Sequence, residues 1–242
     1  MTTRASLAPA TPPAIDLRGV EFAWTPGRPV ISILTLTVRR GDRVFLRGPS
    51  GSGKSTLLAL IAGILRPQAG TVAVLGTDLG TLRGAGRDAF RAAHLGFIFQ
   101  MFNLVPYLSV LDNVLLPLRF SAVRRGRVAN PETEAHRLLQ ELGLDAAEVN
   151  GRGVAELSVG QQQRVAVARA LIGRPELVIA DEPTSALDTD AREAFINLLM
   201  QECASVAATL LFVSHDMSLS PLFDQTLSLP DINRVGSRRP AS

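Results

Sequence analysis

The stretch that decides the fold reads Gly48-Pro49-Ser50-Gly51-Ser52-Gly53-Lys54-Ser55-Thr56. An apolar run at residues 44–46 precedes it and predicts a short buried strand, and residues 57–65 behind it predict a helix that packs on a sheet. The pattern G-x-x-x-x-G-K-[ST] between a strand and a helix is typical of a phosphate-binding loop. We therefore expect an α/β fold that is organised around an anion site.

The chemistry of this stretch favours a phosphate and its metal ion. Gly48, Gly51 and Gly53 allow backbone conformations that a side chain forbids, so successive N–H groups can turn toward one anion. The N-terminus of the following helix adds free N–H groups and the positive end of its dipole. We expect Lys54 to reach the β- and γ-phosphates and the Ser55 hydroxyl to bind Mg²⁺. A glycine-rich turn that fits the pattern by chance is the alternative.

Composition indicates a globular protein with one substantial core. The chain has 242 residues, of which 46% are hydrophobic, and no apolar run approaches the roughly 18–20 residues that span a bilayer. Residues 1–14 are rich in Ala, Thr and Pro without an apolar centre, so we expect a flexible tail and no secretory signal. The lone Cys203 excludes an intramolecular disulfide and is expected to be buried.

The charge of the chain does not predict a nucleic-acid partner. The net charge is +3, from 25 basic and 22 acidic residues, without a concentrated basic run. The denser stretches, residues 124–127 and 234–239, lack interleaved aromatic residues that could stack on bases. We expect them to form solvated loops, with contact to membrane headgroups as the alternative.

An antiparallel hairpin is predicted ahead of the glycine-rich stretch. Residues 15–24 and 31–38 have the apolar patterns of strands, and a Pro- and Gly-rich turn separates them. Trp24 ends the first strand beside this turn. Its position is equally compatible with a ring that has one face open and with an ordinary aromatic residue at the rim of the core.

Polar side chains follow three apolar strands that are predicted downstream. They are Gln100 after residues 95–99, Asp181 and Glu182 after residues 177–180, and His215 after residues 210–213. Ligands of open α/β sheets collect outside the carboxyl ends of strands, so we expect these side chains to meet there. Taken singly, Gln100 is also compatible with a loop residue and His215 with a structural histidine.

Each of these four residues has an expected role. Asp181 would hold Mg²⁺, directly or through water, and Glu182 would face the attacking water as general base. Because side chains alternate on a strand, we expect these two carboxylates to point in different directions. Gln100 would reach the Mg²⁺ or the attacking water, and His215 would donate to the γ-phosphate.

The middle of the chain predicts a helical insert. Strand signals vanish after Met101, and residues 109–120 and 131–142 have the pattern of helices, with a basic, polar loop at 121–130 between them. The insert ends at Leu157-Ser158-Val159-Gly160-Gln161, where Ser158 occupies the N-cap position of a helix that reaches Ile172. This predicts a second anion site, with an ordinary capped helix as the alternative.

Together these motifs resemble those of ABC transporter nucleotide-binding subunits along nearly the whole chain. The correspondences are Walker A at 48–56, the Q-loop at Gln100, the signature at 157–161, Walker B at 177–182, the D-loop at Ser185 to Asp188 and the switch histidine at His215. The resemblance implies a single domain over residues 15–242. Its P-loop NTPase core is a mainly parallel sheet with helices, to which an N-terminal antiparallel β subdomain and a helical subdomain at about 101–165 are added.

The resemblance also implies ligands and a second copy of the chain. ATP would be bound by all residues of 48–56, with Trp24 stacked on the adenine, and Mg²⁺ would be bound by Ser55, Gln100 and Asp181. In the family two subunits meet head to tail, so Ser158, Val159, Gly160 and Gln161 of one copy would close over the ATP of the other, flanked by Asp188 in the D-loop. Val159 departs from the glycine that is usual at its place.

A narrower resemblance concerns the ATPases of lipoprotein-releasing and macrolide-exporting systems. It rests on residues 97–106 and 160–166. It implies an integral membrane permease as partner, gripped by the helical insert and the region around Gln100. The chain would then lie in the cytoplasm on the inner face of the membrane and drive export or envelope-directed transport.

Three other functions are alternatives to this one. The ATPase can instead regulate a membrane-linked complex that remodels the cell envelope without transport. An ABC ATPase that acts on DNA or ribosomes usually has two nucleotide modules or a long coiled-coil insertion, which this sequence lacks. An inactive nucleotide-binding subunit disagrees with the presence of Lys54, Asp181, Glu182 and His215.

Overall fold

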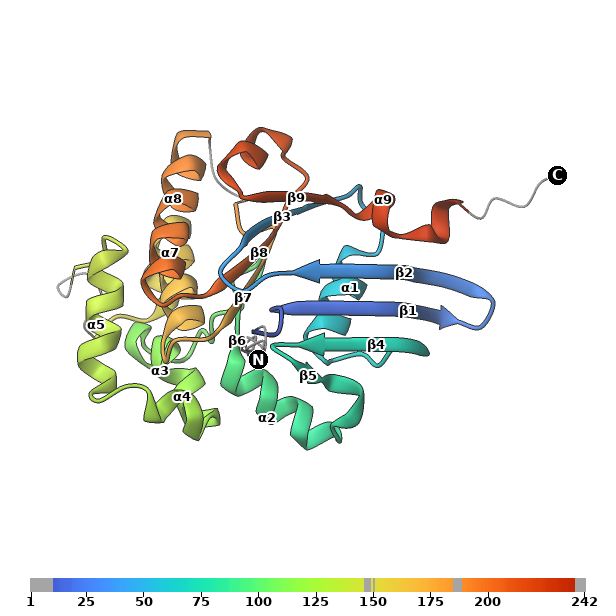
Figure 1. The fold of residues 1–242 in the computed structure, drawn as a ribbon. Helices are drawn as coiled ribbons and strands as arrows, with labels where there is room; N and C mark the ends of the chain where they lie inside the picture. Colours follow the sequence, from blue (N-terminus) through green and yellow to red (C-terminus); the bar gives the residue numbers. More distant parts are fainter. Residues whose placement is uncertain (1–10, 146–148, 150, 185–188, 238–242) are drawn as a thin grey trace, which may run out of the picture.

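Two sheets and a set of flanking helices form the fold (Figure 1). The computed structural model describes residues 11–145, 149, 151–184 and 189–237. The first sheet is antiparallel and has the strand order β2-β1-β4-β5. Its strands are β1 (Ile15–Thr25), β2 (Arg28–Val38), β4 (Ala69–Val74) and β5 (Thr77–Asp78). The predicted hairpin is therefore confirmed, and it forms part of an antiparallel subdomain.

The second sheet is parallel and has the strand order β6-β7-β8-β3-β9. Its strands are β3 (Arg43–Arg47), β6 (Leu95–Ile98), β7 (Leu177–Asp181), β8 (Thr209–Val213) and β9 (Gln225–Ser228). Because all these strands run in one direction, their carboxyl ends lie along one edge of the sheet. The segments that follow β3, β6, β7 and β8 therefore begin side by side.

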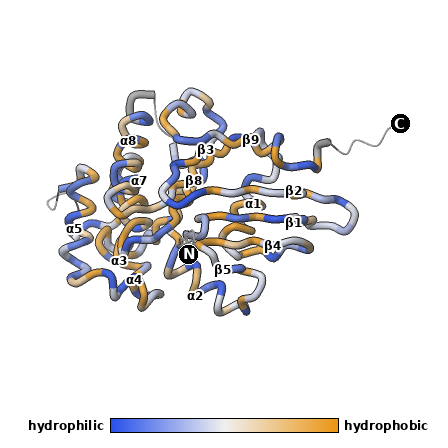
Figure 2. Tube along the Cα trace, viewed as in Figure 1, coloured by the Kyte–Doolittle hydropathy of each residue, from blue (hydrophilic) through white to orange (hydrophobic). Residues whose placement is uncertain are grey.

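Both faces of the parallel sheet are buried at its inner strands, which explains why β7 and β8 are apolar without alternation. Along β8, Leu210 and Phe212 pack into a core shared with the helical side of the molecule. Leu211 and Val213 pack into a second core that is shared with the antiparallel sheet. Figure 2 shows apolar residues gathered along these strands and the helices beside them.

Helices cover the parallel sheet and build the insert. They are α1 (Lys54–Ile61), α2 (Gly84–His94), α3 (Val110–Phe120), α4 (Ala122–Gly126), α5 (Pro131–Glu141), α7 (Val159–Leu171), α8 (Thr189–Ser205) and α9 (Leu229–Ile232). Short 3₁₀ helices span Leu79–Thr81, Val154–Glu156, Met217–Leu222 and Arg234–Ser237. Helices α3, α4 and α5 gather on one side of the molecule, away from the antiparallel sheet (Figure 1). The expected fold class, a P-loop core with an antiparallel and a helical addition, is confirmed.

The expectation of a solvated basic loop at 121–130 is wrong. Residues Ala122–Gly126 form α4, and Arg124 is buried. Its guanidinium donates to the carbonyls of Ile172 (Nε, 2.8 Å), Ala170 (Nη2, 2.7 Å) and Leu95 (Nη1, 3.3 Å). Burial, together with the charge of Arg127, lowers the pKa of Arg124 to about 10. These carbonyls satisfy the buried cation, so Arg124 ties the insert to the core.

We expected residues 1–14 to form a flexible tail, but the tail is shorter than that. Residues 1–10 lie outside the described part of the chain, but Pro12 and Ala14 are held in place. Pro12 O accepts from Arg40 Nε (3.0 Å), and Ala14 is fully buried with its N–H on Val38 O (2.9 Å). These contacts fix the chain just ahead of β1, so the ordered backbone begins before Ile15.

Two further sequence predictions concern burial and the membrane. Cys203 is a free, buried cysteine, as expected, and burial raises the pKa of its thiol to about 12. None of the helices in the described ranges is both long and apolar enough to cross a membrane.

A half-buried ion-pair network joins three elements at the start of β7. Glu176 Oε1 accepts from Arg127 Nη2 (2.9 Å), and His94 Nδ1 lies 3.1 Å from Glu176 Oε2. Burial of the Glu176 carboxyl favours its neutral form, but the hydrogen bonds from His94 and Arg127 outweigh this. They lower the pKa of Glu176 from 4.5 to about 2.

We predict that Glu176→Gln destabilises the protein in a pH-dependent way. The folded pKa of Glu176 lies below the unfolded value, so its contribution is present above about pH 4.5 and disappears as the pH falls to about 2. The variant should lose about 1–2 kcal/mol at pH 7, after allowance for solvent screening. Urea unfolding at pH 7 and pH 3 measures the difference. Glu21→Gln, on exposed β1 surface, is the control, and an equal loss at both pH values would contradict the prediction.

Candidate functional site

The glycine-rich loop connects β3 to α1 and can be built only with glycines at its critical positions. Gly51 and Gly53 have φ values of 77° and 101°, in the left-handed region. A Cβ atom on Gly53 would lie 3.1 Å from Ile31 Cδ1, and one on Gly48 would lie 2.7 Å from Ser52 Oγ. The loop therefore folds tightly over the N-terminus of α1, as the sequence predicted.

Two polar groups of this loop fit a phosphate. Lys54 Nζ donates to Gly48 O (2.7 Å) and Pro49 O (3.3 Å), so the only lysine of the sequence bends back over the loop. Ser52 Oγ is buried without a hydrogen-bond partner among the described residues. A phosphate oxygen would be a partner for both groups, because it accepts from ammonium, hydroxyl and backbone N–H donors alike.

The predicted site residues from distant segments line one cavity of about 540 Å³. Its lining consists of Trp24, Val30, Ser50, Gly51, Gly53, Lys54, Ser55, Thr56, Gln100, Asp181, Glu182 and His215. They come from the ends of β1, β3, β6, β7 and β8 and from the start of α1. The structure thus brings together the residues that the sequence placed at the carboxyl edge of the sheet.

The two adjacent carboxylates do not alternate as expected. β7 ends at Asp181, and Glu182 has a left-handed backbone with φ 47°, so the strand geometry stops between them. Both side chains line the same cavity. Burial raises the pKa of Asp181 and the charge of Glu182 raises it further, while Lys54 lowers it. A cation placed in the cavity would therefore stabilise the ionised form of Asp181.

Glu182 is fixed through both its main chain and its side chain. Its N–H donates to Val213 O (2.9 Å), and His215 Nδ1 lies 2.9 Å from its Oε2. An ionised carboxylate only accepts, so Nδ1 of His215 is then the donor. The side chain of Glu182 is 14% exposed and that of His215 71% exposed, so the pair has a buried acceptor and an open donor.

Trp24 stands at the mouth of the cavity with much of its ring open. It is 65% exposed, and its indole Nε1 donates to Thr56 Oγ1 at 3.4 Å. The ring meets Phe22 edge to face, with centroids 5.1 Å apart and an interplanar angle of 87°. The structure therefore favours the first of the two interpretations of Trp24, a ring with an open face.

The donor set of the cavity fits Mg²⁺ bound together with phosphates. Ser55, Gln100 and Asp181 supply a hydroxyl, an amide and a carboxylate to the same cavity. No group of three or more His, Cys, Asp or Glu residues in the described part of the chain is arranged to hold a metal ion by itself. Mg²⁺ typically takes one or two carboxylates and completes its shell with water and phosphate oxygens.

The signature residues lie apart from this cavity. Ser158 caps α7: its Oγ accepts from the N–H of Gln161 (3.3 Å), and Gln161 Oε1 accepts from the N–H of Ser158 (3.0 Å). Val159 is half exposed, and a Cβ on Gly160 would meet no atom within 4 Å. None of these residues lines the cavity of about 540 Å³ beside the glycine-rich loop. Asp188 lies outside the described residues.

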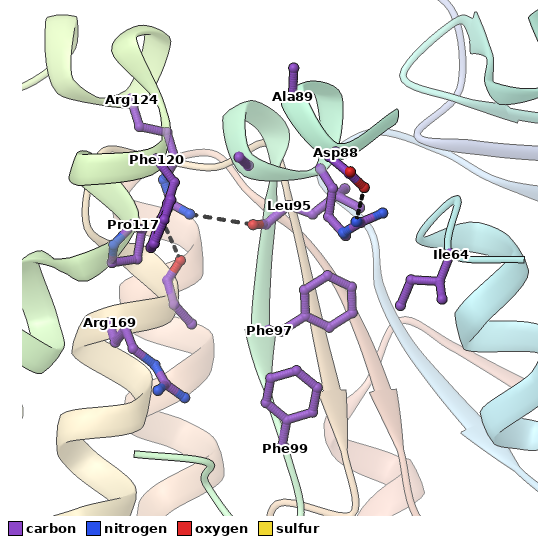
Figure 3. Close-up of a pocket in the computed structure, with 13 residues that line it drawn as sticks. Ile64, Asp88, Ala89, Leu95, Phe97, Phe99, Pro117, Phe120, Arg124 and Arg169 are labelled. Carbon is purple, nitrogen blue, oxygen red and sulfur yellow. Dashed lines mark hydrogen bonds and ion pairs between the residues drawn. The ribbon is translucent and has the colours of Figure 1, made fainter. Parts of the chain in front are cut away.

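A second cavity, of about 660 Å³, lies in the region of the insert and Gln100 that the resemblance assigns to permease contact, although the cavity itself was not predicted. It is an apolar groove between the insert and the core, and Figure 3 shows Phe97 and Phe99 in its centre with Pro117 and Phe120 on one side and Ile64 on the other. The rings of Phe97 and Phe99 are stacked with centroids 5.6 Å apart. Because its lining comes from separate segments, the one local signal in the sequence is an aromatic residue, Phe120, at the end of the helix predicted at 109–120.

The cations that line this groove already have partners. Arg124 is bound to backbone carbonyls, as described above, and Arg169 Nη1 donates to Asn103 O at 2.7 Å. Arg91 Nη1 donates to Ala62 O at 3.1 Å and also pairs with Asp88. The groove therefore exposes aromatic rings to solvent, while the charged side chains around it already have hydrogen-bond partners. An exposed apolar patch with polar residues at its rim is typical of an interaction surface.

Comparisons with known proteins agree with this geometry. A family model described as ABC transporter matches residues 31–185. The lipoprotein-releasing system ATP-binding protein LolD of Anaeromyxobacter dehalogenans is 41% identical over 92% of this chain and 93% of that protein. The macrolide export ATP-binding/permease protein MacB 2 of Aeromonas hydrophila is 34% identical over 95% of this chain but only 35% of that protein.

A solved structure shares the fold. It is described as the dimeric, post-hydrolysis state of the ATP-binding cassette MJ0796 bound to ADP and Pi, with a TM-score of 0.78 and 33% identity. The match covers 88% of this chain and 93% of that one. The expected resemblance to lipoprotein-releasing and macrolide-exporting ATPases is thus confirmed. The chain belongs to the ABC transporter family, in which it is an ATPase.

Proposed function

We propose that this chain is the ATP-binding and ATP-hydrolysing subunit of an ABC transporter that drives a membrane permease as a head-to-tail homodimer. The observation that carries the proposal is the single cavity in which Lys54, Asp181, Glu182 and His215 meet beside the glycine-rich loop. It combines a phosphate cradle with a carboxylate that can activate water. These are the two requirements of phosphoryl transfer to water.

Binding of ATP uses the whole length of the cavity. Trp24 stacks on the adenine, and residues 48–56 wrap the phosphates, with Lys54 exchanging its loop carbonyls for phosphate oxygens. Ser55, Gln100 and Asp181 would hold Mg²⁺, which would neutralise charge on the β- and γ-phosphates.

Hydrolysis depends on the pair formed by Glu182 and His215. A water molecule attacks the γ-phosphorus and transfers a proton to the Glu182 carboxylate as general base, while the bond from the γ-phosphorus to the bridging oxygen breaks. ADP and phosphate are the products. His215, which is largely exposed, can leave Glu182 and donate to a γ-phosphate oxygen. Gln100 lies in the same cavity and orients the water or the metal.

A second copy of the chain completes each ATP site. The signature residues Ser158, Val159, Gly160 and Gln161 lie outside the cavity of their own chain, so they are available to a facing copy. The dimeric description of the MJ0796 cassette supports this arrangement. Val159 places an exposed branched side chain where the family usually has glycine, and we propose that Asp188 flanks the same interface.

The groove of Figure 3 is the proposed docking site of the permease. A cytoplasmic helix of the permease would lay its apolar face on Phe97, Phe99 and Phe120. The MacB 2 relative supports a permease as the occupant, since its name joins ATP-binding and permease functions and this chain spans only 35% of its length. We propose that a helical subdomain at about 101–165 forms one wall of this groove. A change in the position of the subdomain relative to the core would then change its contact with the permease.

The remaining features follow from the relatives. Their lipoprotein-releasing and macrolide-exporting names favour export or envelope-directed transport. The chain would then work in the cytoplasm at the inner face of the membrane, held there by the permease. The charge balance of the sequence favours no nucleic-acid partner.

We predict that Glu182→Gln abolishes most hydrolysis without loss of binding. Removal of a general base should lower kcat by roughly 10²–10⁴-fold, whereas Mg·ATP should still quench Trp24 fluorescence and hold the chain as a dimer in light scattering. Glu132→Gln, in the exposed first turn of α5, is the matched control. Hydrolysis by Glu182→Gln at the parent rate would show that the general-base assignment is wrong.

Lys54 is the only lysine, which makes nucleotide binding measurable by chemical modification. We predict that Mg·ATP at about ten times its Kd slows acylation of the Lys54 amine by about tenfold, because bound phosphates cover it. The α-amino group of the same chain is the internal control and should react at an unchanged rate. Equal modification of Lys54 with and without ATP would remove it from the phosphate site.

We predict that Phe120→Glu uncouples the chain from its permease. Phe120 is 73% exposed at the groove, so a charge there should prevent docking of an apolar helix while basal ATP hydrolysis stays within about twofold. Copurification of the tagged chain with a membrane protein, followed by mass spectrometry, measures docking. The control is Leu34→Glu, a similarly exposed apolar position on β2 away from the groove. Retained copurification of Phe120→Glu would place the docking site elsewhere.

A further inference from the structure

The backbone of Glu182 adopts a conformation that its sequence disfavours. Its φ of 47° lies in the left-handed region, which a residue with a Cβ seldom enters. The next residue is Pro183, and a residue before proline is normally extended. Such a conformation persists only where surrounding contacts hold it.

Hydrogen bonds hold this backbone on both sides of Glu182. The Glu182 N–H donates to Val213 O at 2.9 Å, as part of the edge of the sheet. On the other side, Gln163 Nε2 donates to Pro183 O at 2.7 Å. Gln163 is only 2% exposed and lies on α7, whose N-terminus carries Ser158. The clamp on the Pro183 side therefore comes from the signature helix.

The same helix holds a second left-handed segment near the cavity. Phe102 and Asn103 have φ values of 57° and 49° and follow shortly after Gln100. Arg169 of α7 donates to the carbonyl oxygens of both residues, at 2.7 Å for Asn103. Side chains of α7 thus fix the segments behind two residues of the cavity, Gln100 and Glu182.

We propose that Gln163 is a positioning residue for hydrolysis. It fixes the carbonyl of Pro183, and through it the left-handed backbone that aims the Glu182 carboxylate at the attacking water. The proposal rests on the function proposed above, because it acts through Glu182 as general base. Through this hydrogen bond Gln163 connects Glu182 of one ATP site to α7. In the proposed dimer, the N-terminus of α7 faces the nucleotide that the other copy binds.

A structural role for Gln163 makes a different prediction from a positioning role. If Gln163 only filled the core, its replacement would lower stability and ATP affinity together. If it positions Glu182, its replacement lowers kcat and leaves the Kd for Mg·ATP unchanged, because Gln163 does not line the cavity of the phosphate loop.

The test uses Gln163→Met, which keeps much of the side-chain volume but cannot donate a hydrogen bond. We expect kcat to fall by about tenfold, as for the loss of one orienting hydrogen bond, with the Kd from Trp24 fluorescence within twofold of the parent. Arg164→Gln is the control: it removes a hydrogen bond from the next residue of α7 to Gly143 O, in the insert. Unchanged kcat in Gln163→Met would refute the proposal.

A double-mutant cycle with Glu182→Gln tests whether the effect passes through Glu182. In single-turnover measurements, Gln163→Met should not slow Glu182→Gln further, because the group it positions is already absent. An equal loss in both backgrounds would refute the positioning role. Gln163→Leu is a second variant that cannot donate a hydrogen bond, and failure of both variants to bind ATP would make Gln163 structural and the proposal wrong.

The cycle also separates this inference from the proposed function. If Glu182→Gln hydrolyses ATP at the parent rate, the general-base assignment fails and the positioning role fails with it. If Glu182→Gln is inactive and Gln163→Met behaves as the parent does, the proposed function stands and only the positioning role is refuted.

Discussion

The register of three parallel strands is the constraint on which the site depends. Val213, the last residue of β8, pairs with Leu46 on one side and with Asp181 on the other. Leu46 leads within two residues to the phosphate loop, and Asp181 leads directly to Glu182. Main-chain bonds continue the alignment past the strand ends, from Ser214 N–H to Leu46 O and from Glu182 N–H to Val213 O. One pairing pattern therefore sets the distance between the cradle and the carboxylates, and a slip of one residue would turn every side chain of the strand over.

Burial of both sheet faces is what makes this register rigid. Leu210 and Phe212 belong to one core and Leu211 and Val213 to the other, so β8 has no face that could tolerate a shift. The same burial removes polar side chains from the strands and leaves chemistry to the residues just beyond them. Left-handed backbone occurs at this edge of the sheet at Gly51, Gly53 and Glu182, where packing from both sides can hold it.

The sequence was informative where chemistry follows local order, and less so where it depends on tertiary contacts. The phosphate loop, the strands and the polar residues after them could be predicted, because glycine spacing and apolar runs are local signals. Arg124 was misread because charge density favours a loop, whereas its guanidinium is satisfied by carbonyls from distant segments. The direction of Glu182 was also wrong, since alternation holds only within a strand and φ changes sign just after β7. The groove escaped prediction because no single segment contains it.

Helix α7 contributes residues to the signature, to the contacts that hold the backbone beside Glu182, and to the apolar groove. Its N-terminal Ser158 faces away from the cavity of its own chain, Gln163 holds the backbone beside Glu182, and Arg169 and Ala170 line the apolar groove. A helix is stiff along its axis, so a displacement at one end reaches the others with little loss. If the proposed function holds, docking at the groove, contact at the signature and alignment of Glu182 would all act on this one helix. Because coupling between binding sites is reciprocal, closure of the signature on a facing copy would then change the affinity of the groove for its partner.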